Sequence, residues 1–180
     1  DGVTLNFGGP YYGFVSGGYS IGDIIKNVTV VNSAVLPNGT SHGSYSGLIS
    51  AKSSNSSFKN IIIRDSVIKD SESISIGFTG MVLGNSGLMN QFDELSVEVD
   101  IRLQHDSQYV GGVAGWVWLN NSLKNSVVTG TIDGGVYKLG GFIGGAREIF
   151  IKNSISEITI NGKSGATYCS GFVGNTYKEN

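Results

Sequence analysis

The stretch Leu139-Gly140-Gly141-Phe142-Ile143 decides the fold, because it returns in altered form along the whole chain. Its counterparts lie at residues 11–15, 45–49, 78–82, 110–114 and 169–173. We align the six copies on Gly13, Gly47, Gly80, Gly112, Gly141 and Gly171. Successive glycines are then 34, 33, 32, 29 and 30 residues apart. A period of about 20 to 50 residues is typical of stacked repeats, in which each unit buries its apolar face against its neighbours.

A second column of the same period confirms that the chain is a repeat. It is a triplet of an apolar residue, lysine and asparagine, found at residues 25–27, 58–60, 123–125 and 151–153. The third repeat departs from the triplet with Phe92-Asp93-Glu94. Two columns that keep the same register across five repeats establish a repeated architecture.

Alternating polar and apolar residues, as at 97–103 and 154–160, predict short strands with one buried face. Each repeat holds about three such runs, separated by clusters of Gly, Ser, Asn and Asp that favour turns. The sequence therefore predicts an all-β chain: a right-handed parallel β-helix (solenoid) of about five coils, with 29–34 residues and three short strands per coil. Residues 1–180 would form a single domain.

An antiparallel sandwich or propeller is the rival fold, because Gly-Gly and Asn-Gly pairs also favour hairpins. Alignment on the triplets places Arg64 over Glu98 and Arg102 over Asp133 in neighbouring repeats. Opposite charges on adjacent rungs are what stacked coils prefer, so this pattern favours the solenoid.

The composition limits the classes of partner. A net charge of −2 gives no basic face for phosphate backbones, so we expect no nucleic acid partner. No stretch approaches the roughly 20 apolar residues that cross a bilayer, so we expect no membrane span. The start at Asp1 would be either a mature N-terminus or the edge of a fragment.

The chain resembles the GLUG repeat, whose consensus is Gly-Gly-Leu-Val-Gly, a spacer and Ile-x-Asn-Ser. The similarity lies in Gly-Gly-Phe-Ile-Gly at 140–144 followed by Ile-Lys-Asn-Ser at 151–154, and residues 111–115 and 170–174 are similar. The first three repeats depart from it, with Ser16, Ser50 and Leu83 where the last glycine is expected. The resemblance implies a secreted or surface-bound β-solenoid, as in bacterial adhesins and non-catalytic regions of surface proteases. It implies no catalytic residues.

Four Asn-x-Ser/Thr motifs make candidate glycosylation sites of Asn27, Asn38, Asn55 and Asn120. Composition alone gives about three such motifs, so their number carries little weight. Asn38 and Asn55 lie in turn-rich segments and are the best acceptors. Asn27 belongs to the triplet column, and an internal asparagine ladder at that column would exclude a glycan there.

Glu98 and Asp100 are the candidate catalytic pair. They lie two residues apart on one strand face, roughly 7 Å from each other, which suits acid and base roles at a glycosidic bond. Any solvated strand produces the same pair, and Arg64 and Arg102 are placed to neutralise it. This makes a carbohydrate-active enzyme an alternative rather than the main hypothesis.

Trp116, Trp118 and Tyr109 cluster around the fourth glycine motif and are the candidate binding residues. Exposed aromatic rings there would contact a sugar or a protein partner, whereas packing on their own coil is the simpler outcome. The glycines at 140–145 are not a phosphate loop, because no Lys-Ser/Thr pair follows them.

We expect no metal and no cofactor. His42 and His105 lie in different repeats, and Cys169 in an apolar column is expected to be a small buried core residue rather than a nucleophile. Asp65, Asp70 and Glu72 are interpreted as a solvated acidic turn.

The sequence thus predicts a non-enzymatic extracellular or cell-surface module, structural or adhesive, acting as a rigid spacer or filament component. Its partners would be other surface or filament proteins, copies of itself end to end, or glycans. A β-helix polysaccharide lyase or hydrolase and a lectin-like module are the alternatives. Because no capping helix is predicted at either end, we expect a longer chain or an end-to-end assembly.

Overall fold

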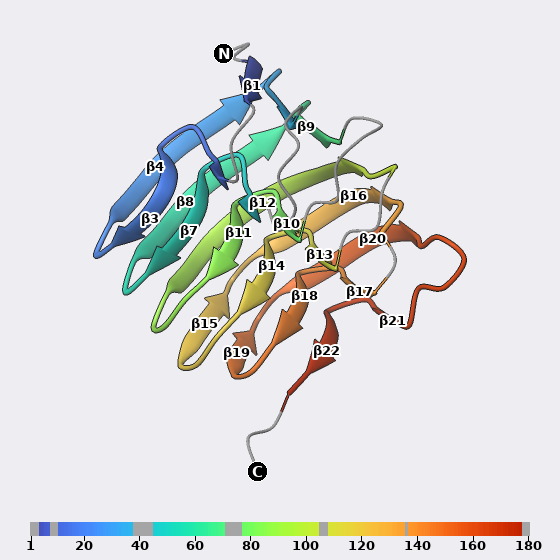
Figure 1. The fold of residues 1–180 in the computed structure, drawn as a ribbon. Coiled ribbons are helices and arrows are strands. Elements are labelled where there is room, and N and C mark those ends of the chain that lie inside the picture. The colour runs from blue at the N-terminus through green and yellow to red at the C-terminus, as the bar shows by residue number, and fades with distance from the viewer. Residues whose placement is uncertain are drawn as a thin grey trace.

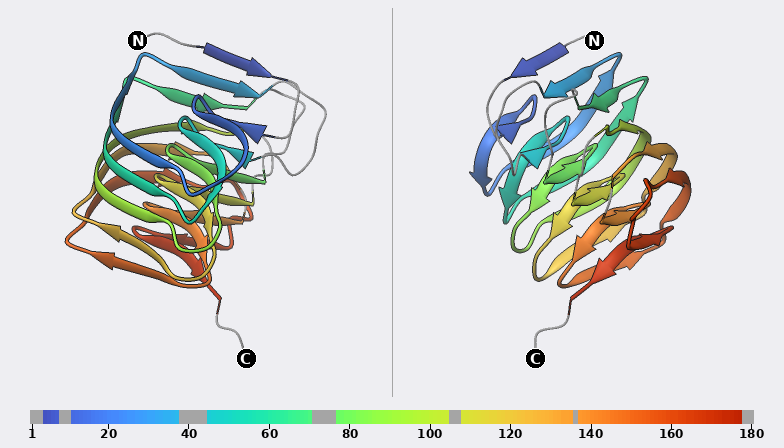
Figure 2. Two further views of the ribbon diagram at one scale, coloured as in Figure 1. Left: turned by 90° about the vertical axis from the view of Figure 1, so that its left-hand side faces the viewer. Right: turned by 45° about the vertical axis from the view of Figure 1, so that its right-hand side comes forward.

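The computed structural model describes residues 4–7, 11–37, 45–70, 77–104, 108–135 and 137–177. These residues form 22 strands and contain no helix. Neighbouring strands in all three sheets run parallel, and the coils stack as a β-solenoid of about five turns, with β1 and β22 at opposite ends (Figures 1 and 2). The predicted parallel β-solenoid is confirmed.

Two of the three sheets consist of short strands. Sheet B stacks β2 (Tyr11–Tyr12), β6 (Tyr45–Ser46), β10 (Phe78–Gly80), β13 (Tyr109–Gly111), β17 (Lys138–Gly140) and β21 (Tyr168–Ser170). Sheet C stacks β3 (Ser16–Ile21), β7 (Ser50–Ser54), β11 (Leu83–Ser86), β14 (Ala114–Val117), β18 (Ile143–Ala146) and β22 (Val173–Thr176).

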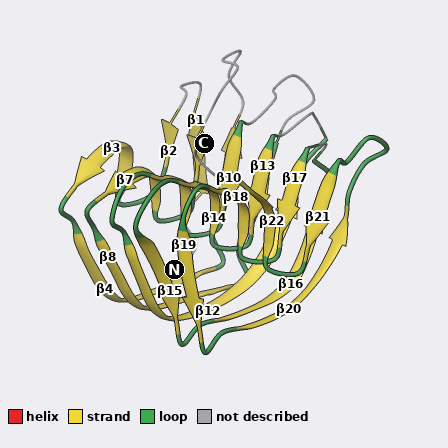
Figure 3. Ribbon diagram, turned by 90° about the horizontal axis from the view of Figure 1, so that it is seen from below, coloured by secondary structure: helices red, strands yellow, loops and turns green. Residues whose placement is uncertain are grey.

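Sheet A forms the long side of each coil. Its strands are β1 (Thr4–Phe7), β4 (Ile24–Val31), β5 (Ala34–Pro37), β8 (Ser57–Arg64), β9 (Val67–Lys69), β12 (Gln91–Arg102), β15 (Asn121–Lys124), β16 (Val127–Asp133), β19 (Ile149–Lys152) and β20 (Ile155–Asn161). Seen along the stack, sheet A curves around one side of the molecule and sheets B and C occupy the other (Figure 3). A coil therefore has three faces, as predicted, but the third is long, and β12 runs through it for 12 residues.

The core fills the space between the three sheets. In sheet A it includes the apolar member of each triplet, in a column that pairs Ile25, Phe58, Phe92, Leu123 and Ile151 across successive coils. Phe58 and Phe92 are fully buried and stack with their ring centroids 5.2 Å apart. Alternation along β12 continues this pattern, because every apolar residue of that strand is buried.

The asparagine of each triplet makes a corner in the chain. Positive φ angles of 49° to 57° occur at Asn27, Asn60, Glu94, Asn125 and Asn153. Asparagine tolerates this left-handed conformation better than other residues with a side chain, which explains why the triplet ends on it.

The predicted glycine alignment is wrong by one residue from the fourth repeat onward. The strands pair Gly80 with Gly111, Gly111 with Gly140 and Gly140 with Ser170, so Gly112, Gly141 and Gly171 lie one position further along.

The same register corrects the view that the third repeat lacks its last glycine. Leu83 pairs with Ala114, so Gly84 occupies the column of Gly115 and Gly144. A Cβ at Gly144 would lie 2.4 Å from the backbone nitrogen of Val110. The motif is glycine-rich because the backbones of sheets B and C approach too closely for side chains.

Cys169 is exposed, so the expectation that it is a buried core residue is wrong. It pairs with Leu139, which is fully buried in the preceding coil. The column is internal, but no described strand of sheet B lies beyond β21 to cover this last position.

Candidate functional site

A hollow of about 280 Å³ lies between the outer surfaces of sheets B and C. We call it the aromatic hollow, and its lining residues are Tyr45, Lys52, Phe78, Asn85, Tyr109, Trp116 and Trp118. The structure thus brings together all three predicted binding residues. Four further members, from the second and third coils, were not predicted to belong to this site.

The sheet B wall is a column of stacked rings. The centroids of Tyr11 and Tyr45 are 5.2 Å apart, those of Tyr45 and Phe78 are 5.0 Å apart, and those of Phe78 and Tyr109 are 5.1 Å apart. The planes deviate from parallel by only 5° to 8°. Equivalent residues of neighbouring coils lie one strand spacing apart, which brings their rings into contact. The faces of the two middle rings are consequently covered by their neighbours.

The sheet C wall is formed by Lys52, Asn85 and Trp116, which pair in register on three successive coils. The ammonium of Lys52 lies over the ring of Tyr45, 5.6 Å from its centroid. The same ammonium lies 5.0 Å from the ring centroid of Tyr19 on sheet C, and through its contact with Tyr45 it links the two walls on the N-terminal side.

The two tryptophans differ in their accessibility. Trp116 is 7% exposed and packs edge-on against Tyr109, with the centroids 4.8 Å apart. Trp118 is 37% exposed, and the guanidinium of Arg147 lies 4.6 Å from the centroid of its ring. Trp116 therefore helps to build the wall, whereas Trp118 keeps exposed ring surface at the hollow. Their role in binding stays a prediction.

Asn85 is a polar residue of the hollow, and its side chain is nearly buried, with 3% exposed. Its Oδ1 has no hydrogen-bond partner among the described residues. Buried polar atoms normally have a partner. Six buried side-chain oxygens of the described residues lack one, and that of Asn85 is the one that belongs to a lining residue of the hollow.

A hydrogen-bonded cluster of Tyr109, Lys138 and Tyr177 closes the C-terminal side. The Lys138 ammonium donates to the Tyr109 hydroxyl at 3.4 Å, and the two tyrosine hydroxyls are 3.3 Å apart. Burial raises the pKa of Tyr109, and its hydrogen bond with Tyr177 raises that pKa further. Burial would raise the pKa of Tyr177 as well, but hydrogen bonds from Lys138, Tyr109 and Asn175 outweigh burial and lower it.

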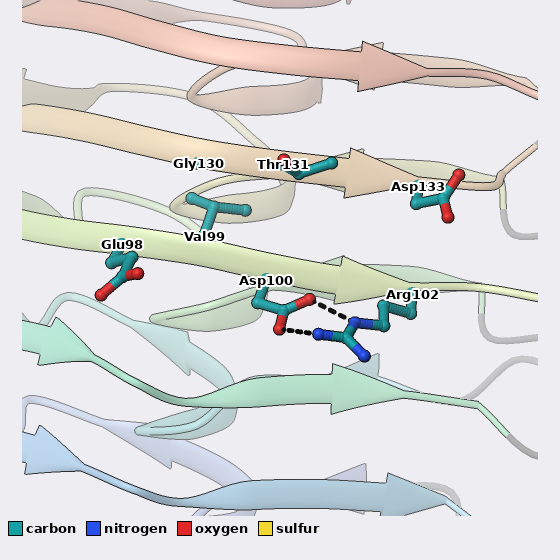
Figure 4. A pocket seen from close by; sticks show the side chains of 7 residues that line it. All are labelled: Glu98, Val99, Asp100, Arg102, Gly130, Thr131 and Asp133. Atoms are coloured by element: carbon teal, nitrogen blue, oxygen red, sulfur yellow. Dashed lines mark hydrogen bonds and ion pairs between the residues drawn. The ribbon is translucent and has the colours of Figure 1, made fainter.

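The predicted catalytic pair lies on the outer face of sheet A, beside a shallow hollow of about 350 Å³ that also includes Thr131 and Asp133 (Figure 4). The Arg102 guanidinium donates to both oxygens of Asp100, at 2.7 and 2.6 Å (Figure 4). Oε2 of Glu98 accepts the backbone N–H of Asp65 at 3.1 Å. Each carboxylate is thus already engaged by the chain itself.

The predicted alignment of opposite charges on adjacent strands is correct, but the ion pair that forms is a different one. Arg102 pairs with Asp133 across β12 and β16, yet its ion pair is with Asp100 of its own strand, at 2.6 Å. Arg64 directly follows Ile63, which pairs with Val97, so it lies opposite Glu98 as expected. Exposed pairs of this kind contribute about 0 to 1 kcal/mol.

Three of the four candidate glycosylation sites are exposed at left-handed corners: Asn27, Asn55 and Asn120. Asn38 lies outside the described residues. The triplet asparagines do form a ladder, but on the outside, where Nδ2 of Asn60 donates to Oδ1 of Asn27 at 2.8 Å. A glycan attaches to Nδ2, so the expected conflict at Asn27 does not arise.

The internal ladder is formed instead by asparagines that were not singled out from the sequence. Asn90 and Asn121 are buried, and Oδ1 of Asn121 accepts the backbone N–H of Asn90 at 2.9 Å. Oδ1 of Asn90 in turn accepts the N–H of Ser56 at 2.9 Å. The available signal was a polar residue just before or at the start of successive strands of sheet A: Ser56 before β8, Asn90 before β12 and Asn121 at the start of β15.

The acidic turn expected around Asp65 is only partly solvated. Asp65 is exposed, but Asp70 is 2% exposed and accepts the backbone N–H of Gln104. Glu72, His42 and His105 lie outside the described residues. Within the described ranges, no group of three or more His, Cys, Asp or Glu side chains is placed to hold a metal ion.

Comparisons of the chain with protein-family models, with curated proteins and with solved structures give no match. Membership of the GLUG family therefore stays a prediction. Across the described ranges there is no helix long and apolar enough to cross a membrane. The class that the fold and the site define is a parallel β-solenoid with an aromatic hollow on its flank.

Proposed function

We propose that this protein is a non-enzymatic structural or adhesive module of the extracellular space or cell surface, a rigid spacer whose flanks contact glycans or other proteins. The observation that supports this function most directly is the use of side chains to join one coil to the next. The ring column on sheet B, the external ladder at Asn27 and Asn60, and the internal ladder at Asn90 and Asn121 all run along the stack.

Such columns make every coil depend on its neighbours, which is what a stiff element needs. The partners that we propose are surface or filament proteins, including further copies of this chain joined end to end, and glycans. A glycoprotein, an adhesin and a filament component are compatible forms of the same role.

Surface labelling of intact source cells tests this proposal. A membrane-impermeant amine-reactive biotin reagent should modify exposed lysines such as Lys26 and Lys124, and mass spectrometry of the captured peptides should find them before lysis. Recovery of those labelled peptides only after lysis would contradict the proposal.

The enzymatic alternative rests on Glu98 and Asp100. Its weakness is that both carboxylates already interact with the chain itself. Asp100 accepts hydrogen bonds from Arg102, and Glu98 accepts one from a backbone N–H, so neither is arranged to exchange a proton with a substrate. Turnover of an acidic polysaccharide that disappears in the Glu98→Gln/Asp100→Asn double variant would establish it. The lectin-like alternative has better geometric support, in the unpartnered oxygen of Asn85.

A further inference from the structure

The buried side chain of Asn85 lacks a partner for a local reason. Its neighbours on sheet C are Lys52, whose ammonium lies over two tyrosine rings, and Trp116. Across the hollow, the ring from its own coil is Phe78, which has no hydroxyl, unlike Tyr45 and Tyr109 on either side.

The same fold satisfies another buried asparagine completely. Asn90 is fully buried, its Nδ2 donates to the carbonyl of Ser53 at 2.8 Å and to Oγ of Ser86 at 2.7 Å, and its Oδ1 accepts an N–H. The open acceptor of Asn85 is therefore not a general property of buried amides in this solenoid. It belongs to the hollow.

The shape of the hollow limits the size and orientation of a ligand. A space of about 280 Å³ is at the small end of ligand pockets, enough for a single ring-sized unit. Both faces of Tyr45 and Phe78 are covered by neighbouring rings, and Tyr109 has Phe78 stacked on it and the Lys138 ammonium 4.7 Å from its ring centroid. A ligand therefore meets the edges of these rings and is oriented by polar contacts rather than by stacking.

The polar groups that line the hollow indicate which chemical groups a ligand should carry. Oδ1 of Asn85 needs a donor, which a hydroxyl or an N–H supplies. Lys52 is the one charged side chain among the described residues that line the hollow, and an ammonium favours a carboxylate. A ring that carries both hydroxyls and a carboxylate matches both groups.

We infer that the aromatic hollow binds one uronic acid unit of an acidic glycan, with a sugar hydroxyl donating to Oδ1 of Asn85 and the sugar carboxylate paired with Lys52. The inference rests on the proposed function, because a module at the cell surface is one that meets extracellular glycans. It adds the ligand class and the two residues that select it.

Binding can be followed through the fluorescence of Trp116 and Trp118, which line the hollow and are the two tryptophans of the chain. The probes are galacturonic acid tetrasaccharide and, as the neutral comparison, cellotetraose. We expect saturable binding of the acidic probe to the full chain and at least tenfold weaker binding of the neutral one. Asn85→Leu and Lys52→Met should each weaken binding of the acidic probe at least tenfold.

Two control variants separate recognition from folding. Lys26→Met removes an exposed lysine of sheet A and should leave affinity unchanged. Asn85→Leu removes an unsatisfied buried acceptor and should keep or raise the melting temperature, whereas Asn90→Leu breaks satisfied bonds and should lower it.

Absence of saturable binding of the acidic probe would overturn the inference, as would equal binding of cellotetraose or undiminished binding by Asn85→Leu. None of these results affects the surface-labelling test, so failure of the inference and failure of the proposed function are distinguishable.

Discussion

The ring of Phe78 lies parallel to that of Tyr109, with the centroids 5.1 Å apart and 6° between the planes. Phe78 makes the same contact with Tyr45 on its other side. It is therefore one of the two inner rings of a column of four that joins coils through side chains on the outer surface of the solenoid. Core packing is only one of the forces that hold these coils together.

Phe78→Ala should destabilise the protein by about 2–4 kcal/mol, because it removes a partly buried ring and both of its stacking contacts. Phe150→Ala is the matched control, since Phe150 is 56% exposed and should change stability by less than about 1 kcal/mol. Urea denaturation followed by circular dichroism measures both. Equal losses would show that the column contributes no stability.

Gly144→Ala should destabilise the protein by about 1–3 kcal/mol or prevent folding, because the new methyl group would meet only backbone atoms. Those atoms are the nitrogen of Val110 at 2.4 Å and the carbonyl oxygen of Gly115 at 2.6 Å. Gly171→Ala is the control, since no heavy atom lies within 4 Å of a Cβ at that position. Thermal melts of the two variants should separate clearly, and a well-folded Gly144→Ala variant would contradict the close approach of sheets B and C.

The sequence was sufficient for the period, the parallel solenoid and the triplet column, because these depend on local alternation and on repeated corners. It was insufficient for the exact register of the glycines. The doublets at 111–112 and 140–141 offer two alignments that differ by one residue, and only backbone contacts between sheets decide which glycine pairs with Gly80.

Only the part of the candidate site that is formed by residues close in sequence could be predicted. Trp116, Trp118 and Tyr109 are close in sequence, so their clustering could be expected. Lys52 and Asn85 come from two earlier coils, and their place in the hollow follows from the register of sheet C. That Asn85 is buried without a partner depends on the rings around it, which no sequence pattern reports.

Tyr177 should ionise before Tyr45 and Tyr109 as the pH rises. Burial opposes its ionisation, but hydrogen bonds from Lys138, Tyr109 and Asn175 lower its pKa below the ordinary value. Burial raises the pKa of Tyr45 and of Tyr109, so these two should ionise later. Ultraviolet absorbance of tyrosinate during an alkaline titration measures the order.

The ionisation of Tyr177 should disappear from that titration in Tyr177→Phe and move to higher pH in Lys138→Met. Lys52→Met is the control, because its ammonium lies at the other side of the hollow, over Tyr19 and Tyr45. Loss of absorbance in Tyr177→Phe only at the pH where Tyr45 and Tyr109 ionise, or above it, would contradict the predicted order.

Asp93 should contribute to acid sensitivity through its bond to Asn125. Nδ2 of Asn125 donates to Oδ1 of Asp93 at 2.9 Å and is the main cause of the lowered pKa of that carboxyl group, with Lys59 adding to it. A carboxyl group whose pKa is lowered by folding contributes stability above its unfolded pKa of about 3.9, and loses that contribution as the pH falls through the lower folded value.

Asn125→Gly should therefore raise the pKa of Asp93. The protein should then lose less stability on acidification from pH 5, and the difference should be less than about 1 kcal/mol because the interaction lies at the surface. Glycine accepts the left-handed φ of 49° at residue 125, so the change removes the side chain without straining the corner. Asn153→Gly is the matched control, because Asn153 has a φ of 50° and donates to Asn125 rather than to Asp93. The pKa is measured from the carboxyl carbon shift of Asp93 by NMR, and an equal rise in both variants would show that the bond to Asn125 is not its cause.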